Sequence, residues 1–314
     1  MDLDLHQLRA LAAAVDEGTF ERAAQTLHVT PSAISQRIRA LETATGRVLL
    51  VRSKPVRATE SGESILLLAR QIELLAADAA AGLAGHGVDV GDGSPHDGAG
   101  RPVEKPTLTV AVNADSLSTW FLPALAPLAD LASFHLLRED ERRTSELLRD
   151  GSAVAAVTTD ARPVAGCTVT PLGSMRYLPV AQAAFAARWF PDGPTPAALS
   201  RAPVLVFDRD DPLQHAYLAR RAGPAQTLSP PSHMIPSSTD FAAAIHLGLG
   251  WGMLDELQLP ARGRPDELVD LDPGGHIDVP LYWQQWRLRS PSLDGLAAAV
   301  VGAARAALRP SAPA

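Results

Sequence analysis

The stretch "HVTPSAISQRIRALE", residues 28–42, has the spacing of a helix that follows a short turn. Thr30 is suited to cap this helix, because its hydroxyl can accept a hydrogen bond from a free N–H of the first turn. Pro31 suits the first helical position, where its missing N–H is no loss. At about 100° per residue, three apolar side chains cluster on one side: Ile34, Ile38 and Leu41. We expect this side to pack on neighbouring helices.

The opposite side of the same helix carries short hydroxyls, an amide and a guanidinium: Ser32, Ser35, Gln36, Arg39 and Thr43. These groups match the donors and acceptors that base edges present in the DNA major groove. Helix-turn-helix proteins place the N-terminal end of their second helix in that groove. Arg37 lies on the flank, and the free N–H groups of residues 30–33 could hold a phosphate. The alternative is a solvated face on an ordinary helical hairpin.

The surrounding sequence favours the nucleic-acid interpretation. Residues 3–16 and 20–27 have helical spacing, and "RVLLVRSKPVRATE", residues 47–60, predicts a two-stranded wing around a Lys-Pro turn. Residues 20–60 contain seven Lys and Arg against three Asp and Glu, although the whole chain has a net charge of −7. A small basic module on an acidic body suggests one face that contacts an anion. Three wing side chains could contact phosphates or the minor groove: Arg52, Lys54 and Arg57.

Residues 60–83 are predicted to form one long helix, which Thr59 caps. Its apolar residues recur every three or four positions, as in the seam of a short coiled coil: Ile65, Leu68, Ile72, Leu75 and Ala79. We expect this helix to be a dimerisation helix; the alternative is that the stripe packs on its own domain. Residues 84–106 are rich in Gly, Pro and Asp without periodicity, which predicts a flexible linker.

From Thr107 onward the pattern changes to alternating strands and helices, which predicts a parallel-type α/β sheet. A change of sheet near Tyr177 suggests two lobes with a cleft between them. The expected architecture is α+β and multidomain. A winged helix-turn-helix (residues 1–59) and its linker helix precede a two-lobed α/β domain (residues 107–314). The first lobe is expected to comprise residues 107–177 and 275–310, and the second residues 178–274.

Several classes of protein find no support in the sequence. The first residues form no signal-peptide pattern and no stretch approaches 18 apolar residues, so we expect a cytoplasmic protein without a membrane span. The single cysteine, Cys167, excludes an intramolecular disulfide and a cysteine-cluster metal site. The nine histidines show no metal-binding spacing, and no nucleophile elbow or phosphate-binding loop occurs. We therefore expect no catalytic residues, no metal and no cofactor.

The segment "AAQTLHVTPSAISQRIRALETATGRVLLVRSKPVRATESG", residues 23–62, resembles the winged helix-turn-helix of LysR-type transcriptional regulators. The order of head, long helix and two-lobed body also matches that family. "VTPSAISQRI" replaces the commonest recognition-helix pattern of the family and is similar to the ArgP/LysG branch. "NADSLSTWFLPAL", "MRYLPVA", "GLGWGML" and "DVPLYWQQWRL" resemble the same branch. This resemblance implies an effector-binding body whose ligand is a basic amino acid, lysine or arginine.

The candidate effector residues include groups that could bind the carboxylate of an amino-acid ligand and groups that could bind its cationic side chain. Hydroxyls near the helix that starts around Asp115 and at the end of a buried strand could face the cleft, and a cationic side chain needs an acid. The candidates are Asp115, Ser116, Thr119, Asp140, Thr158, Thr159, Asp208 and Asp210, with Asp115 or Ser116 as the helix cap. Glu139 and Asp211 are further acids of this kind. For each acid alone, a solvated surface position is the alternative.

The sequence thus predicts a DNA-binding regulator that acts as a homodimer or homotetramer. The resemblance implies control of an exporter or a metabolic gene for basic amino acids, with operator DNA and RNA polymerase as partners. Two alternatives remain at this point. One is a regulator of the same architecture with a different small-molecule effector. The other is a solute-binding or enzymatic α/β protein with an accessory head.

Overall fold

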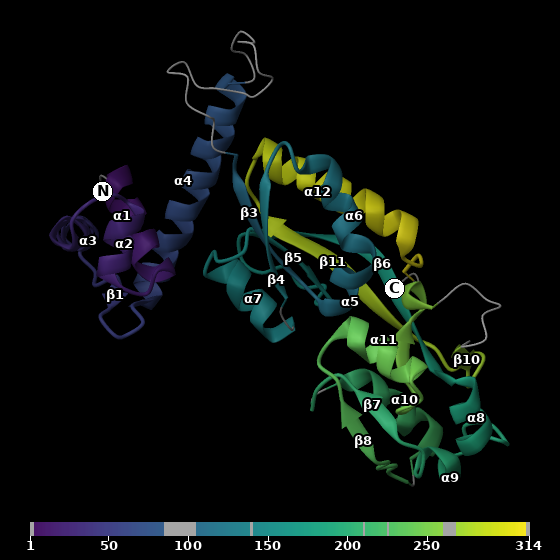
Figure 1. Cartoon of the computed structure of the whole chain (residues 1–314). Coiled ribbons are helices and arrows are strands. Elements are labelled where there is room, and N and C mark those ends of the chain that lie inside the picture. Colours follow the sequence, from purple (N-terminus) through teal and green to yellow (C-terminus); the bar gives the residue numbers. More distant parts are fainter. Residues whose placement is uncertain are drawn as a thin grey trace.

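The computed structural model describes residues 3–84, 105–138, 141–209, 211–224, 226–259 and 268–311. A small helical head, one long helix and a larger two-lobed body follow one another along the chain (Figure 1). The predicted linker at residues 84–106 lies, apart from its ends, outside the described residues. Within the described ranges, no helix has the length and apolar composition that crossing a bilayer requires.

The head contains three helices and a short hairpin: α1 (Leu5–Asp16), α2 (Phe20–Thr26), α3 (Pro31–Thr45), β1 (Leu50–Val51) and β2 (Arg57–Ala58). The two strands pair antiparallel and form the predicted wing. Thr30 caps α3, since its Oγ1 accepts the N–H of Ala33 at 3.2 Å. Gly46 ends the helix with φ 65°, a conformation that favours glycine. The predicted helix boundaries and the wing are confirmed.

Helix α4 (Glu60–Ala84) connects the head to the body. Thr59 caps it as predicted, because its Oγ1 accepts the N–H of Gly62 at 3.0 Å. Leu66 and Ala69 are buried in the core of the head, whereas Leu74 is buried in the core of the body. Parts of the apolar surface of α4 therefore pack within the chain, and Leu75 remains 38% exposed.

Arg70 of α4 contacts both the head and the body. Its guanidinium pairs with Asp16 of α1. It also donates to the backbone oxygen of Asp150 at 3.0 Å and to Ser152 Oγ at 3.2 Å, in the loop that leads into β5. Further along α4, Asp78 accepts the hydroxyl of Ser290, the residue that caps α12. Head and body are thus joined through side chains as well as through the chain.

The main sheet of the body has seven strands: β3 (Thr107–Val112), β4 (Ser133–Arg138), β5 (Ala155–Thr158), β6 (Cys167–Gln182), β9 (Gly252–Asp255), β10 (Leu268–Asp270) and β11 (Ile277–Trp286). Their order is β10-β6-β11-β5-β3-β4, and β9 also pairs with β6. Only β4, β3 and β5 run parallel; the other pairs are antiparallel. The expectation of a parallel-type sheet was wrong for this larger part, because β11 returns from the second lobe and enters beside β5 in the opposite direction.

Helices cover both lobes of the body. The first lobe carries one continuous helical run and two further helices: α5 (Ala114–Ser116), η1 (Leu117–Phe121, a π-helical turn), α6 (Leu122–Leu125), η2 (Ala126–Leu128), α7 (Glu141–Arg149) and α12 (Pro291–Ala307). The second lobe contains a parallel pair of strands and several short helices: β7 (Val204–Val206), β8 (Ser232–Met234), α8 (Ala183–Trp189), α9 (Pro196–Leu199), α10 (Pro212–Ala222), α11 (Ser238–His246) and η3 (Glu256–Gln258).

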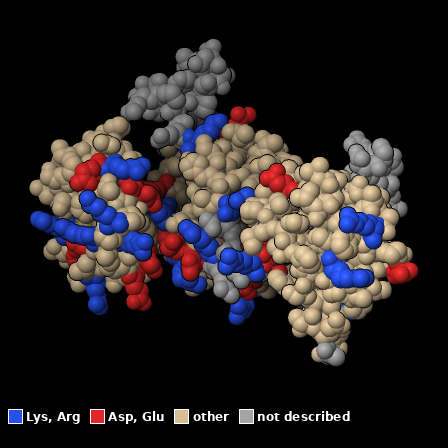
Figure 2. Space-filling view, turned by 60° about the horizontal axis from the view of Figure 1, so that its bottom comes forward, with Lys and Arg blue, Asp and Glu red and all other residues tan. Residues whose placement is uncertain are grey.

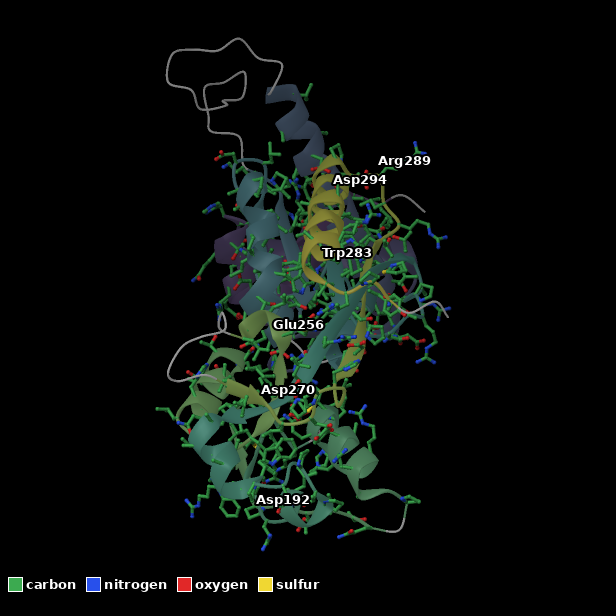
Figure 3. All side chains as sticks on the ribbon, turned by 90° about the vertical axis from the view of Figure 1, so that its right-hand side faces the viewer. Asp192, Glu256, Asp270, Trp283, Arg289 and Asp294 are labelled. Carbon is green, nitrogen blue, oxygen red and sulfur yellow. The ribbon has the colours of Figure 1, made fainter. Side chains whose placement is uncertain are left out.

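The long strands β6 and β11 run through both lobes and form the hinge between them (Figure 1). Figure 3 shows Trp283 within the first lobe near α12, Asp192 and Asp270 in the second lobe, and Glu256 where the lobes meet. Trp283 is 1% exposed and belongs to the core of the body. The antiparallel hinge places residues of distant segments next to each other at the lobe junction.

Candidate functional sites

Helix α3 presents the expected polar side to solvent. Ser32, Gln36 and Arg39 are exposed, and Ser35 and Arg37 are partly exposed. The opposite side is fully buried, since three apolar side chains are 0% exposed: Ile34, Ile38 and Leu41. The first turn is fixed by Thr30 and Pro31, the cap and the first helical residue. The helix therefore holds its polar side rigidly outward, as a base-reading helix requires.

The wing adds three exposed cations beside α3: Arg52, Lys54 and Arg57. The Arg52 guanidinium lies 5.7 Å from the centre of the Phe20 ring, which restrains its position. None of the three forms an ion pair with another described residue. Figure 2 shows several basic side chains that project from the head, at the left, with acidic side chains between them. These charges are available for phosphates.

Asp115 lies at the junction of the two lobes. Its Oδ2 accepts the hydroxyl of Tyr177, on the hinge strand β6, at 2.7 Å. Its Oδ1 accepts the hydroxyl of Ser238, at the start of α11 in the second lobe, at 2.6 Å. The expectation that Asp115 or Ser116 caps the helix was wrong. Asn113 is the cap, because its side chain accepts the N–H of Ser116 at 2.8 Å.

The candidate hydroxyls differ in what they contact. The Thr119 hydroxyl donates to the backbone oxygen of Asp115 at 2.7 Å, so its hydrogen is used within its own helix. Thr158 is 3% exposed and its Oγ1 accepts the N–H of Asp160 at 3.1 Å. Thr159 is partly buried. Ser116 is 0% exposed, and its Oγ has no hydrogen-bond partner among the described residues.

The structure does not group the acids that were predicted to contact the cationic side chain of a ligand. Asp140 and Asp210, together with Glu139, lie outside the described residues, and Asp208 is exposed. Asp211 is 5% exposed and caps α10. Its carboxylate accepts the N–H of Phe207 at 2.8 Å and that of Leu213 at 3.0 Å. Burial raises the pKa of Asp211, although these two hydrogen bonds oppose the shift.

The structure adds four residues to this junction that were not among the candidate site residues: Tyr177, Ser238, Asp255 and Gln258. The Gln258 side chain donates to Ser238 Oγ at 3.0 Å and extends the network into η3. Asp255 ends β9 opposite Tyr177. Burial raises the pKa of Asp255 to about 7, and the nearby charge of Asp115 adds to this shift. An acid that ends the apolar run "GWGML" was the available signal for this position.

A cavity of about 500 Å³ lies beside this network. Its lining comes from both lobes: Ser118, Thr119 and Trp120 of η1, Thr239 and Ala242 of α11, Leu257 and Gln258 of η3, and Ala307 of α12. Trp120 is 4% exposed, and its Nε1 has no hydrogen-bond partner among the described residues. The junction therefore combines a hollow with polar groups from both lobes, which is the usual composition of a small-molecule site.

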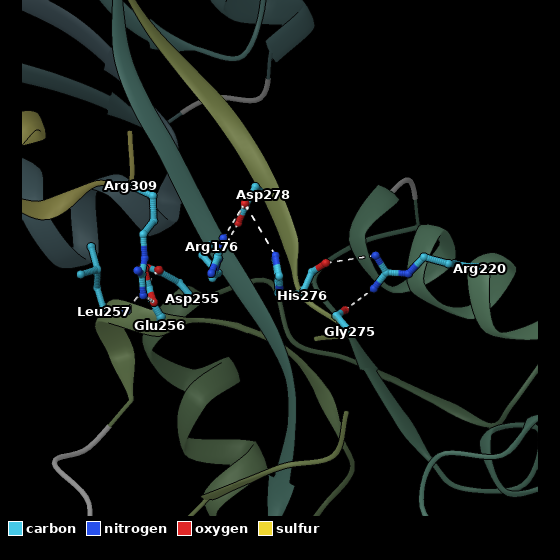
Figure 4. Close-up of polar contacts among 9 residues, drawn as sticks. All are labelled: Arg176, Arg220, Asp255, Glu256, Leu257, Gly275, His276, Asp278 and Arg309. Atoms are coloured by element: carbon cyan, nitrogen blue, oxygen red, sulfur yellow. Dashed lines mark hydrogen bonds and ion pairs between the residues drawn. The ribbon is translucent and has the colours of Figure 1, made fainter. Parts of the chain in front are cut away.

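The reverse face of the hinge is fixed by ion pairs (Figure 4). Arg176 of β6 donates two hydrogen bonds to Asp278 of β11, at 2.7 and 2.8 Å. Arg309, after α12, donates two to Glu256 at 2.8 Å each. Each arginine lowers the pKa of its carboxylate partner. Acids on this face are neutralised by arginines, unlike Asp115 and Asp255.

The metal-ligating residues and the single cysteine were the remaining groups with possible chemistry of their own. No cluster of three or more His, Cys, Asp or Glu there could hold a metal ion. Cys167 is buried, and burial raises the pKa of its thiol to about 11, so it is a poor nucleophile.

Comparison with known proteins identifies both parts of the chain. Residues 5–63 match the bacterial regulatory helix-turn-helix protein, lysR family, and residues 102–305 match the LysR substrate binding domain. The chain is 45% identical to the lysine export transcriptional regulatory protein LysG of Corynebacterium efficiens over 304 residues, which are 96% of this chain and 98% of that protein.

Two solved structures agree with this over nearly the whole length. The crystal structure of ArgP from Mycobacterium tuberculosis has a TM-score of 0.83 at 42% identity and covers 99% of this chain and 100% of that one. Full-length LysG from Corynebacterium glutamicum with bound effector Arg has a TM-score of 0.76 at 41% identity, covering 98% and 100%. The chain therefore belongs to the LysR family of bacterial helix-turn-helix proteins, and it is a DNA-binding transcriptional regulator.

Proposed function

We propose that this regulator responds to a basic amino acid, lysine or arginine, and controls an exporter or a metabolic gene for such amino acids. The observation that carries this proposal is the junction at Asp115. Its carboxylate meets groups from the hinge and from the second lobe, and no basic side chain pairs with it among the described residues. A cationic ligand supplies the missing charge. The related LysG of Corynebacterium glutamicum with bound effector Arg supports a ligand of this class.

For DNA, we propose that the outward side of α3 reads base edges in the major groove. Gln36 and Arg39 are exposed and carry the bidentate groups that discriminate bases best. Ser32 and Ser35 belong to the same outward side, and Thr30 and Pro31 fix the start of the helix. Arg37 lies on the flank, and the wing side chains contact phosphates or the minor groove: Arg52, Lys54 and Arg57. Neutralising about five phosphates would give a log–log salt dependence of affinity with a slope of roughly −4 to −5 for each head.

For the effector, we propose a site between the lobes that Asp115, Ser116, Thr119, Thr158 and Thr159 line. Ser116 Oγ, which has no hydrogen-bond partner among the described residues, and the partly buried Thr159 are suited to contact the polar groups of an amino acid. Asp140, Asp208 and Asp210 remain candidates for a second charge contact. Ligand binding can shift the placement of lobes and heads only through different affinities for the two arrangements.

The same proposal covers assembly and location. We propose that α4 joins two copies in a homodimer or homotetramer, since Leu75 and Ala79 of its stripe are exposed. The predicted domain boundaries, residues 1–59, 60–83, 84–106 and 107–314, are part of this proposal, as are a cytoplasmic location and contact with RNA polymerase. The basic wing beside a base-reading helix favours a regulator over a solute-binding or enzymatic protein with an accessory head.

A thermal-shift screen against the individual amino acids tests the effector. A ligand that binds the native state raises the melting temperature, and a concentration of 100 Kd adds about 2.7 kcal/mol. Lysine or arginine should shift the transition, and alanine, leucine and glutamate should not. The Asp115→Asn variant should lose most of the shift. A wild-type protein that ignores lysine and arginine at millimolar concentrations would remove the proposed effector class.

A further inference from the structure

Tyr177 at the lobe junction donates its hydroxyl to Asp115 at 2.7 Å and lies opposite Asp255 in the register of β6 and β9, and Asp211 is a third acid whose charge acts on it. All three charges raise the pKa of Tyr177, after the larger effect of burial. None of the three acids forms an ion pair with a basic side chain within the described part of the chain. Asp211 accepts two backbone N–H groups, so Asp115 and Asp255 are the two carboxyl groups that a ligand could still engage.

Asp255 is the deepest of these acids. It is 1% exposed, and it faces Tyr177 in the antiparallel register of β6 and β9, so both side chains lie on the same face of the sheet as Asp115. Its Oδ1 accepts the N–H of Leu257 at 3.2 Å. Its Oδ2 is buried and has no hydrogen-bond partner among the described residues. A buried carboxylate oxygen without a partner is costly, because it has lost water and gained nothing in return.

A second buried group at this place is also without a partner. Ser116, the residue next to Asp115, is 0% exposed and its Oγ has no partner in the described ranges. The Ser116 hydroxyl, next to Asp115 in the chain, and Asp255 Oδ2 can each accept a hydrogen bond. Acceptors grouped around buried negative charge suit a donor that is itself cationic, since charge-assisted hydrogen bonds are the stronger ones.

We infer that Asp255 and Asp115 together bind one cationic group of the effector, an ammonium or a guanidinium, and that Asp255 determines the preference for basic over neutral ligands. This inference rests on the proposed function and adds a residue and a role to it. Asp115 holds the cation from the first lobe and Asp255 from the second. The positive charge of the ligand is therefore contacted from both lobes at once, and it favours the arrangement in which the two lobes lie close to the ligand.

The charges on the other elements around Asp255 are consistent with this role. Glu256 follows it on η3, but its carboxylate turns to the reverse face of the hinge and pairs with Arg309 (Figure 4). Arg176 on that face is paired with Asp278. The two arginines on this face are thus paired with other acids, and within the described ranges no basic side chain pairs with Asp255 or Asp115, which leaves both free to meet a cationic ligand.

A thermodynamic cycle tests the inference: one carboxylate of the protein and one charged group of the ligand are removed separately and together, and the binding affinities are compared. Binding of arginine, citrulline and 5-guanidinopentanoate is measured by thermal shift and competition on the wild type and on Asp255→Asn. Citrulline lacks the side-chain cation, and 5-guanidinopentanoate lacks the α-ammonium. We expect Asp255→Asn to weaken arginine binding by about tenfold or more, or roughly 1.4 kcal/mol. We expect the affinity for one of the two analogues to change less than about threefold, because that analogue lacks the group that Asp255 contacts. Lysine, norleucine and 6-aminohexanoate give a parallel series.

Glu256→Gln is the matched control. It removes one negative charge from the next residue, on the reverse face, and should leave the arginine-to-analogue ratios unchanged. Asp115→Asn is the second variant and should show the same ligand dependence as Asp255→Asn. Equal losses for all three ligands in both variants would show a structural role and overturn the inference, as would unchanged arginine binding. A wild type that binds neither arginine nor lysine would instead overturn the proposed function.

Discussion

Asp255→Asn should remove a pH dependence that the buried carboxyl of Asp255 imposes on the free energy of unfolding. The pKa of Asp255 is raised from 3.8 to about 7, so the native protein holds a proton there that the unfolded chain has released. Its stabilising contribution is complete below the unfolded pKa and is lost as pH rises through the folded pKa. The asparagine variant lacks this proton and should have a flatter stability curve.

The size of the effect follows from the distance between pH and the folded pKa. At a pH of about 5.5, roughly 1.5 units below that pKa, the proton contributes about 2 kcal/mol, and at a pH of about 8.5 it contributes almost nothing. Relative to the wild type, Asp255→Asn should therefore gain about 2 kcal/mol across this window.

Urea unfolding of the body, followed by tryptophan fluorescence at both pH values, measures this difference. Asp160→Asn is the control. Arg162 lowers the pKa of Asp160, so that carboxyl does not titrate in the window and the variant should differ from the wild type by the same amount at both ends. An Asp255→Asn difference that does not change with pH would show that the folded protein does not release a proton from Asp255 in this window and refute this reasoning.

Four further substitutions test other parts of the molecule. Gln36→Ala should weaken specific operator binding by about 1–3 kcal/mol while non-specific binding changes less, and a footprint with unchanged base preference would contradict base reading. Gly62→Ala should destabilise the head, because a Cβ would lie 2.0 Å from the backbone oxygen of Leu49, whereas Gly82→Ala has open space and should be neutral or stabilising by up to about 1 kcal/mol. The melting temperatures of both variants, measured by calorimetry, test this prediction, and equal melting temperatures would contradict it. Arg70→Ala should raise amide-hydrogen exchange in residues 150–153, and unchanged protection there would show that the guanidinium does not hold that loop.

The head could be predicted in detail because its signals are local. Thr30, Pro31 and Gly46 mark the ends of α3 through backbone requirements that each residue meets by itself. The burial of Ile34 and Ile38 follows from the helical period, since the polar side left no other face to pack. The wing and the cap of α4 at Thr59 were predictable for the same reason.

The body could be predicted only in part, because its arrangement depends on distant contacts. The hydrogen bonds of Asp115 reach residues 62 and 123 positions away, and no local pattern joins Asp115, Tyr177 and Ser238. The cap at Asn113 was missed, since Asn113, Asp115 and Ser116 lie within four residues and are all of types that cap helices well. Alternating strands and helices also do not reveal that β11 returns antiparallel beside β5.

Selection from random duplex DNA tests the central claim most directly. The wild-type protein is presented with the DNA pool in the presence and absence of arginine or lysine, and the bound sequences are read out. The account predicts enrichment of one motif, a base preference that Gln36→Ala relaxes, and an affinity or footprint that changes with the basic amino acid but not with leucine. Enrichment of no motif, or of one that neither the substitution nor the amino acid alters, would contradict it.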